Sequence, residues 1–206
     1  MKKKMMVVDI GSGNFGSLKS AFNKLNIPFK VCKSVNDFED TNKIVLPGVG
    51  SFPNFMKGLK NQGFEELLKK LLLSKKSSIL GICVGYQALF NESEEIQTTK
   101  GLALVDGKIN KLSTKKNIKI PHIGWNQCIN TRENILFHEI PDRSDFYFCH
   151  SYAPSNISVN YKISITKYGD NFASSLSHNN IYGVQFHPEK SQINGLKILK
   201  NFYENI

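Results

Sequence analysis

A short apolar run that ends in Gly-x-Cys-x-Gly constrains the fold of this chain more than any other feature. Residues 78–82 are typical of a buried strand, and residues 86–90 are compatible with a helix. Glycines on both sides of Cys83 permit a tight strand-to-helix turn that a Cβ would obstruct. Such a turn lifts the cysteine out of the sheet and directs helical N–H groups and the helix dipole at its sulfur, which favours thiolate over thiol. The alternative is a buried small hydrophobic residue, a common role of free cysteine.

A second apolar run, near the C-terminus, ends in His-Pro-Glu. Pro188 restricts the residue before it to extended geometry, so His187 is expected to stay strand-like. Positions i and i+2 of an extended chain share a face, so Glu189 is expected beside the imidazole, where it can fix the tautomer and stabilise the protonated form. A cysteine, a histidine and an orienting carboxylate are the set that covalent acyl chemistry needs. The combination favours catalysis over a surface histidine and a solvated glutamate.

These two motifs resemble those of the class I (triad) glutamine amidotransferases, in which Gly-x-Cys-x-Gly-x-Gln is paired with a distal His-Pro-Glu. More narrowly, the sequence is similar to the glutaminase subunits of imidazole glycerol phosphate synthase, from histidine biosynthesis. The resemblance runs nearly end to end, with motifs at residues 9–14, 46–50, 81–87, 93–95, 121–126, 147–152 and 183–191. Val84 and Tyr86 stand where leucine and methionine are usual, which alters packing beside the nucleophile and leaves the reacting groups intact.

Acyl transfer also needs N–H donors aimed at the developing oxyanion. The N–H of Val84, directly after the nucleophile, is the natural first donor. Residues 47–50 (Pro-Gly-Val-Gly) follow a strand, and glycine there allows close approach and peptide reorientation, so the N–H of Val49 or Gly50 is the candidate second donor. A plain turn is the alternative for this loop. The resemblance implies that the loop can hold an inactive orientation until the partner responds to its own ligand.

The resemblance also implies which residues bind substrate. Gln87 lies one helical turn after the cysteine and on the same face. In the family, the positions that match Gln87 and Glu95 bind L-glutamine, and the acid holds its α-ammonium group. The backbone that matches His150, Ser151 and Tyr152 meets the α-amino acid end. Without the resemblance, Glu95 would be interpreted as a solvated loop acid.

Three further positions match residues that face a synthase partner in the family: Asn14, Trp125 and Tyr147. Without the resemblance, the two aromatic residues would be interpreted as core residues. The implied partner is a cyclase subunit with a (β/α)8 barrel, which forms a heterodimer with the glutaminase and receives its ammonia. The implied reaction is hydrolysis of L-glutamine through a thioester on Cys83, with no cofactor and no metal. The sequence also lacks ligand spacings of the zinc type.

Strand-like and helix-like segments alternate in the first half of the chain. Strands are expected at residues 5–9, 29–32, 43–46 and 78–83, and helices at 15–24, 53–60 and 64–73. This alternation is typical of a parallel sheet with helices on both faces. From residue 101 to about 177 the pattern is strand-like, at 107–112, 118–126, 146–152 and 162–167, and an amphipathic helix is expected at 192–205.

We therefore expect one α/β domain over residues 1–206. Its mostly parallel central sheet is flanked by helices and extended by an appended antiparallel sheet in the second half. The resemblance implies the same architecture, the flavodoxin-like fold of class I glutaminases. Asp9, residues 47–50, Cys83 and His187 then fall at the carboxyl ends of strands, where the sites of such sheets gather.

Composition excludes several classes of function. The net charge is +10, but only Arg132 and Arg143 among the 27 basic residues are arginines, and proteins that read base edges depend on arginine, so no nucleic-acid partner is expected. No apolar stretch reaches membrane-spanning length, and the run before Asp9 is too short for a signal peptide, so no membrane partner is expected. Four widely spaced cysteines fit free thiols in a reducing cytoplasm.

Residues 11–16 also fit the dinucleotide-binding pattern G-x-G-x-x-G. That pattern expects an acid at the end of the second strand, whereas residues 31–34 contain none and the next acid is Asp37. A tight turn over the sheet is therefore the favoured interpretation.

Three alternatives stay open at this point. The first is a similar glutaminase that feeds a sugar amidotransferase of surface-polysaccharide synthesis. The second is a stand-alone γ-glutamyl hydrolase. The third is a non-catalytic nucleotide-binding or interaction protein.

Overall fold

The main sheet has nine strands in the order β2-β1-β3-β4-β13-β12-β11-β8-β9. Strands of the first half of the chain, which alternate with helices, form its parallel part. The computed structural model describes residues 4–11, 15–113, 118–130, 132–155, 157 and 160–206, so the interface prediction for Asn14 lies outside the described residues. The neighbours β2, β1, β3 and β4 pair in parallel, as the sequence predicts. These elements are β1 (Met5–Val8), α1 (Phe15–Lys24), β2 (Phe29–Cys32), β3 (Lys43–Gly48), α2 (Phe52–Asn61), α3 (Phe64–Leu73) and β4 (Ser78–Cys83).

The second half of the chain continues this sheet with antiparallel strands and one further parallel strand. Its strands are β8 (His122–Asn130), β9 (Ser144–His150), β11 (Lys162–Tyr168), β12 (Asp170–His178) and β13 (Ile181–Val184). The pairs from β13 through β12, β11 and β8 to β9 are antiparallel. On its other side β13 pairs in parallel with β4, with Gly183 opposite Gly81. This pairing brings the segment that contains His187 to the same end of the sheet as Cys83.

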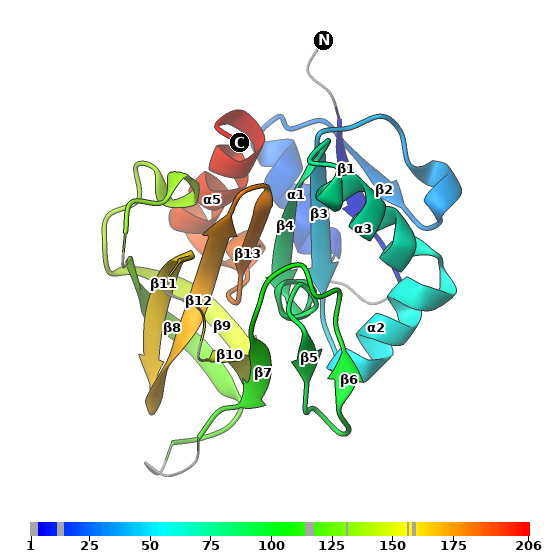
Figure 1. The fold of residues 1–206 in the computed structure, drawn as a ribbon. Helices are drawn as coiled ribbons and strands as arrows, with labels where there is room; N and C mark the ends of the chain where they lie inside the picture. The colour runs from blue at the N-terminus through cyan, green and yellow to red at the C-terminus, as the bar shows by residue number, and fades with distance from the viewer. Residues whose placement is uncertain (1–3, 12–14, 114–117, 131, 156, 158–159) are drawn as a thin grey trace.

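A second sheet of four short strands, in the order β10-β7-β5-β6, lies beyond the carboxyl ends of β3 and β4 (Figure 1). Its members are β5 (Glu92–Ser93), β6 (Thr99–Lys100), β7 (Lys108–Lys111) and β10 (Tyr152–Ser155). The predicted α/β class is confirmed. The added strands form two groups: one extends the main sheet, and the other makes this separate sheet.

Helices cover both faces of the parallel part. In Figure 1, α2 and α3 lie over one face, and α1 and the C-terminal α5 (Gln192–Glu204) lie over the other. All four residues of β1 are buried, which is typical of a strand covered on both faces. Short helices complete the chain: α4 (Val84–Gln87) and the 3-10 turns η1 (Val35–Asp37), η2 (Ile135–Phe137) and η3 (Pro188–Lys190). Among the described residues, no helix is long and apolar enough to cross a membrane.

Several elements differ from their expected bounds. The helix after the nucleophile begins at Val84, and hydrogen-bonded turns follow it instead of a helix through residue 90. The strand expected at 146–152 is two strands, because the chain passes at Ser151 from the larger sheet to the smaller one. The strand expected at 118–126 begins at His122, after Pro121, which has no N–H for a sheet ladder. Strand β12 lies largely within the region of strand-like pattern, but no separate strand was expected at its residues.

Candidate active site

Cys83 joins β4 to α4 with backbone angles φ 55° and ψ −112°, which an L-residue rarely adopts. The flanking glycines make this turn sterically accessible. A Cβ on Gly81 would lie 2.7 Å from the carbonyl oxygen of Gly85, and one on Gly85 would lie 1.8 Å from the carbonyl oxygen of Leu46 in β3. Backbone atoms cannot move aside as a side chain can. Both glycines are therefore required if the turn is to pack directly against β3.

Tyr86, which stands where the family usually has methionine, lies over a pair of glycines on neighbouring strands. Gly81 and Gly183 are opposite each other in β4 and β13. A Cβ on Gly183 would lie 2.0 Å from Cδ2 of the Tyr86 ring, which is fully buried and packs edge-on against Phe90. Burial raises the pKa of the Tyr86 hydroxyl well above its usual value. The larger ring is thus accommodated by the missing side chain of Gly183.

His187 and Glu189 are in direct contact. His187 has extended backbone angles, φ −97° and ψ 97°, as the sequence predicts, and its Nδ1 lies 2.9 Å from Oε1 of Glu189. The predicted reason for the contact is wrong, because the chain is not extended through residue 189. It turns into η3 at Pro188, and this turn brings the carboxylate to the imidazole. Since a carboxylate only accepts, Nδ1 carries the proton and Nε2 is free to face the cysteine.

The surroundings of His187 favour its protonated form. Burial lowers its pKa, but the charge and hydrogen bond of Cys83, and then those of Glu189, outweigh burial and raise the pKa to about 10.

Gln185, fully buried, places its Nε2 at 3.8 Å from the Cys83 sulfur and can donate to it. Ser191 donates to the His187 carbonyl at 2.7 Å and accepts from the Tyr147 N–H at 2.9 Å. Sequence reasoning gave no role to Gln185 or Ser191, because Gln185 contacts Cys83, 102 residues away, and Ser191 contacts Tyr147, 44 residues away.

A cavity of about 190 Å³ lies over the nucleophile. This is smaller than the roughly 300–1,000 Å³ of pockets for drug-sized ligands, so it suits a small ligand. Its lining consists of Val49, Gly50, Cys83, Val84, Gln87, Glu95, Cys149, His150, Ser151, Tyr152, His187 and Lys190. The structure therefore brings together the predicted nucleophile, base, oxyanion-hole and glutamine-binding residues. Glu189 is not part of this lining, and its carboxylate contacts the imidazole of His187 from outside the cavity.

The two side chains predicted to bind glutamine have contacts of their own. The Nε2 of Gln87 donates to the Tyr152 carbonyl at 2.8 Å and to Oε1 of Gln185 at 3.1 Å. Oε2 of Glu95 accepts from the N–H of Phe52 at 2.7 Å, in the first turn of α2. Glu95 therefore stabilises this helix start while it borders the cavity, and it is not the freely solvated acid that the sequence alone would give.

Beside the cavity, β8 and β9 carry an exposed patch that we call the edge patch: Ile123, Trp125, Tyr147 and Cys149. Ile123 pairs with Cys149 across the strands, and Trp125 pairs with Tyr147. The side chains of Ile123 and Trp125 are 59% and 48% exposed. Trp125 is thus a surface residue and not the core aromatic that it could have been without the resemblance. Tyr147 is half-buried, and Nζ of Lys190 lies 5.6 Å from its ring centre.

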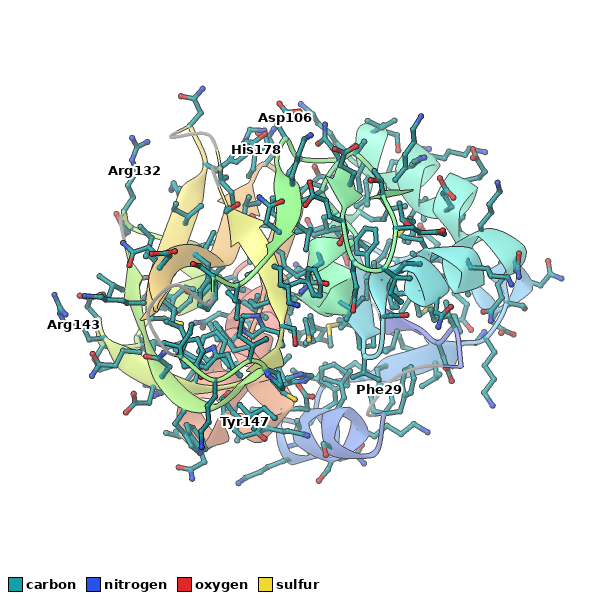
Figure 2. All side chains as sticks on the ribbon, turned by 90° about the horizontal axis from the view of Figure 1, so that it is seen from below. Phe29, Asp106, Arg132, Arg143, Tyr147 and His178 are labelled. Atoms are coloured by element: carbon teal, nitrogen blue, oxygen red, sulfur yellow. The ribbon has the colours of Figure 1, made fainter. Side chains whose placement is uncertain are left out.

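Other potential sites receive no support. Among the described residues, no group of three or more histidine, cysteine or acidic side chains could hold a metal ion. Oδ2 of Asp37, the first acid after the second strand, accepts from the N–H groups of Lys33 and Ser34 at 2.8 and 2.9 Å. Both arginines, Arg132 and Arg143, lie at the outer edge of the antiparallel strands, on the opposite side from the parallel half (Figure 2).

Comparison with known proteins agrees with this geometry. Residues 6–206 match the family "Glutamine amidotransferase class-I", and the chain belongs to that family. Relatives include imidazole glycerol phosphate synthase subunit HisH 2 of Vibrio vulnificus, 39% identical over 98% of this chain and 94% of the relative. The HisH protein of Chlorobaculum tepidum is 40% identical over 97% of this chain and 99% of the relative. Within class I, the chain is a member of the HisH glutaminase subunits.

Solved structures show the same fold at lower identity. The structure of PurLQS from Thermotoga maritima has a TM-score of 0.73 at 18% identity and covers 98% of both chains. A crystal structure of a glutamine amidotransferase has a TM-score of 0.71 at 16% identity, over 97% of both chains. The predicted class I fold is therefore confirmed by independent structures.

Proposed function

We propose that Cys83, His187 and Glu189 are the catalytic residues of a glutaminase that works within imidazole glycerol phosphate synthase. The observation that carries this proposal is that Cys83, from β4, and His187, from the segment after β13, line one cavity, while Glu189 contacts the imidazole of His187 from outside it. The raised pKa of His187 supports the imidazolium form, which can protonate the departing nitrogen.

The Cys83 thiolate attacks the side-chain carboxamide carbon of L-glutamine and forms a tetrahedral oxyanion. Main-chain N–H groups of Val84 and of the Val49–Gly50 loop stabilise that charge. His187 then protonates the departing nitrogen, and ammonia leaves as the γ-glutamyl thioester forms. His187 next takes a proton from water, whose oxygen attacks the thioester. Glutamate leaves and the thiolate is restored, so one glutamine and one water give one glutamate and one ammonia.

The remaining lining residues bind the amino-acid end of the substrate. The carboxylate of Glu95 attracts the α-ammonium group, and the backbone of His150, Ser151 and Tyr152 supports the same end. The amide nitrogen of Gln87 already donates to Tyr152 and Gln185, so the group of Gln87 that meets the substrate would be its amide oxygen. The small volume of the cavity supports an amino acid as the ligand.

The product ammonia would be protonated in bulk water, so direct transfer to a partner is chemically favourable. The edge patch lies next to the cavity, and Lys190 and Cys149 border both. We infer that the patch docks the cyclase, whose (β/α)8 barrel uses the ammonia, and that the complex is a heterodimer. The free thiols of all four cysteines support a reducing cytoplasm as the location.

The test is partner-dependent glutamine hydrolysis by the purified complex. The Cys83→Ala variant is expected to lose glutaminase activity by at least about three orders of magnitude, while the cyclase still uses added ammonium. Cys32→Ala, at a buried cysteine outside the site, is the matched control and is expected to retain activity. Unchanged hydrolysis by Cys83→Ala would refute the proposal. Recovery of a different synthase from cell extract would refute the histidine-pathway assignment alone.

A further inference from the structure

A chain of buried and partly buried hydrogen bonds joins strand β8 to the cavity. Nδ2 of Asn126 lies 3.3 Å from Nε2 of His122, and Nδ1 of His122 lies 3.1 Å from Nε2 of His150. Nδ1 of His150 lies 2.9 Å from the carbonyl oxygen of Tyr152. His122 and His150 are 3% and 7% exposed. The proposed reaction makes no use of His122, which does not line the cavity.

Only one arrangement of protons satisfies all three contacts. The Tyr152 carbonyl only accepts, so Nδ1 of His150 must carry a proton. The amide group of Asn126 is oriented by its neighbours, because its Oδ1 accepts from the N–H of Gln127 and its Nδ2 donates to the Lys167 carbonyl. Nε2 of His122 must therefore accept from Asn126. It follows that Nδ1 of His122 donates to Nε2 of His150, and that both rings are neutral with the proton on Nδ1.

The protein environment supports neutral rings in fixed positions. Burial lowers the pKa of His122 to about 4, and burial is also the main cause that lowers the pKa of His150 to about 3. The His122 ring is stacked with Tyr168 and Phe148 at centroid distances of 3.9 and 4.8 Å. These contacts prevent the ring from turning or from exchanging its partner for water.

At its other end, the chain of hydrogen bonds reaches the nucleophile. The carbonyl oxygen of Tyr152 accepts a second hydrogen bond, at 2.8 Å, from Nε2 of Gln87. The same nitrogen reaches Gln185, which in turn donates to the Cys83 sulfur. The carbonyl of Tyr152 is therefore held from two sides, by a histidine of the larger sheet and by a glutamine of α4.

We propose that His122 is a positioning residue for glutamine binding: through His150 it holds the segment from His150 to Tyr152 in the shape that receives the amino-acid end of the substrate. This inference rests on the proposed glutaminase function. Strand β8 also carries Trp125, so these hydrogen bonds run to the cavity from a strand that bears part of the edge patch. His122 does not touch substrate in this account, and its effect is on binding and not on the reacting groups.

Two variants of equal shape isolate the hydrogen bond. His122→Asn places an amide nitrogen where Nδ1 stands and can donate to His150, whereas His122→Leu has the same branching and no donor. Both lose the ring stacking, so a difference between them reports the hydrogen bond. In the complex with its partner, KM for glutamine is expected to be at least about tenfold higher in His122→Leu than in His122→Asn, which is about 1.4 kcal/mol. The kcat values are expected to agree within about threefold.

Equal KM values in the two variants, or a loss confined to kcat, would overturn the proposal. Imidazole nitrogen NMR of the wild-type chain at neutral pH provides a test that needs neither activity nor variants. Both His122 and His150 are expected in the neutral form protonated at Nδ1, which is the minor tautomer of free histidine in water. A charged ring, or His150 protonated at Nε2, would also overturn it. If the wild-type complex fails to hydrolyse glutamine, the proposed function falls, and the NMR result still decides the tautomers.

Discussion

The contact between Tyr86 and Gly183 gives a quantitative test of how the nucleophile turn is packed. A Cβ at position 183 would lie 2.0, 2.7 and 2.9 Å from three atoms of the Tyr86 ring, where carbon atoms normally stay about 3.5–4.0 Å apart. Overpacking of a core costs about 1–3 kcal/mol. Because the ring is fully buried between Gly183 and Phe90, we expect Gly183→Ala to cost about 3 kcal/mol.

The Tyr86→Met substitution restores the residue usual in the family and replaces the rigid ring by a flexible chain. In that background Gly183→Ala is expected to cost less than about 1 kcal/mol, which gives a coupling free energy of about 2 kcal/mol between the two positions. Urea unfolding of the wild type, both single variants and the double variant measures this coupling. Gly16→Ala is the control, because a Cβ there has nothing within 4 Å and its effect should add to that of Tyr86→Met. If Gly183→Ala and Tyr86→Met are additive within about 0.5 kcal/mol, the packing argument is wrong.

Three more predictions concern the reaction. Glu189→Gln keeps an oxygen that can accept from Nδ1 of His187 but removes the negative charge that helps to raise the pKa of the imidazole. This pKa therefore falls, and the alkaline limb of the kcat/KM profile should move to lower pH by about 1–2 units. An unmoved limb would show that the charge of Glu189 does not control the imidazole. Glu95→Gln keeps an oxygen that accepts from the Phe52 N–H but loses the carboxylate charge. KM for glutamine should therefore rise about 10–100-fold without loss of α2 stability. An unchanged KM would contradict binding of the α-ammonium group by Glu95. Trp125→Ala should weaken partner binding at least about tenfold, as measured by calorimetry. The free energy of unfolding should change by less than about 0.5 kcal/mol, because the side chain is half-exposed. Wild-type affinity in this variant would exclude Trp125 from the interface.

Features set by local sequence were predictable. Glycine on both sides of Cys83 indicates a tight strand-to-helix turn, and the alternation of strands and helices through residue 83 indicates the parallel half. The bounds of α1, β2, α3 and β4 agree with the expected ranges for this reason. Pro188 correctly predicts the extended backbone of His187, since this restriction acts between neighbours.

Features set by distant contacts were not predictable. Residues 170–178 include three serines, and no separate strand was expected there within the strand-like region; they form β12 because β11 and β13 pair with them on both sides. The contact of Glu189 with His187 was expected, but its cause was not, because the η3 turn depends on packing of Ser191 and Gly195 against the segment around Pro188. His122 was part of a matched motif, but only the fold shows that its partner is His150, 28 residues away.

The central claim is that Cys83 becomes the acyl carrier during turnover. The direct measurement is to mix the partner-bound enzyme with carbon-labelled L-glutamine, quench with acid during turnover, and map the labelled peptide by mass spectrometry. The account predicts a γ-glutamyl thioester on the peptide that contains Cys83, absent from Cys83→Ala and released by mild base. Label on another residue, or full turnover with no covalent label under conditions that trap thioesters, would contradict it.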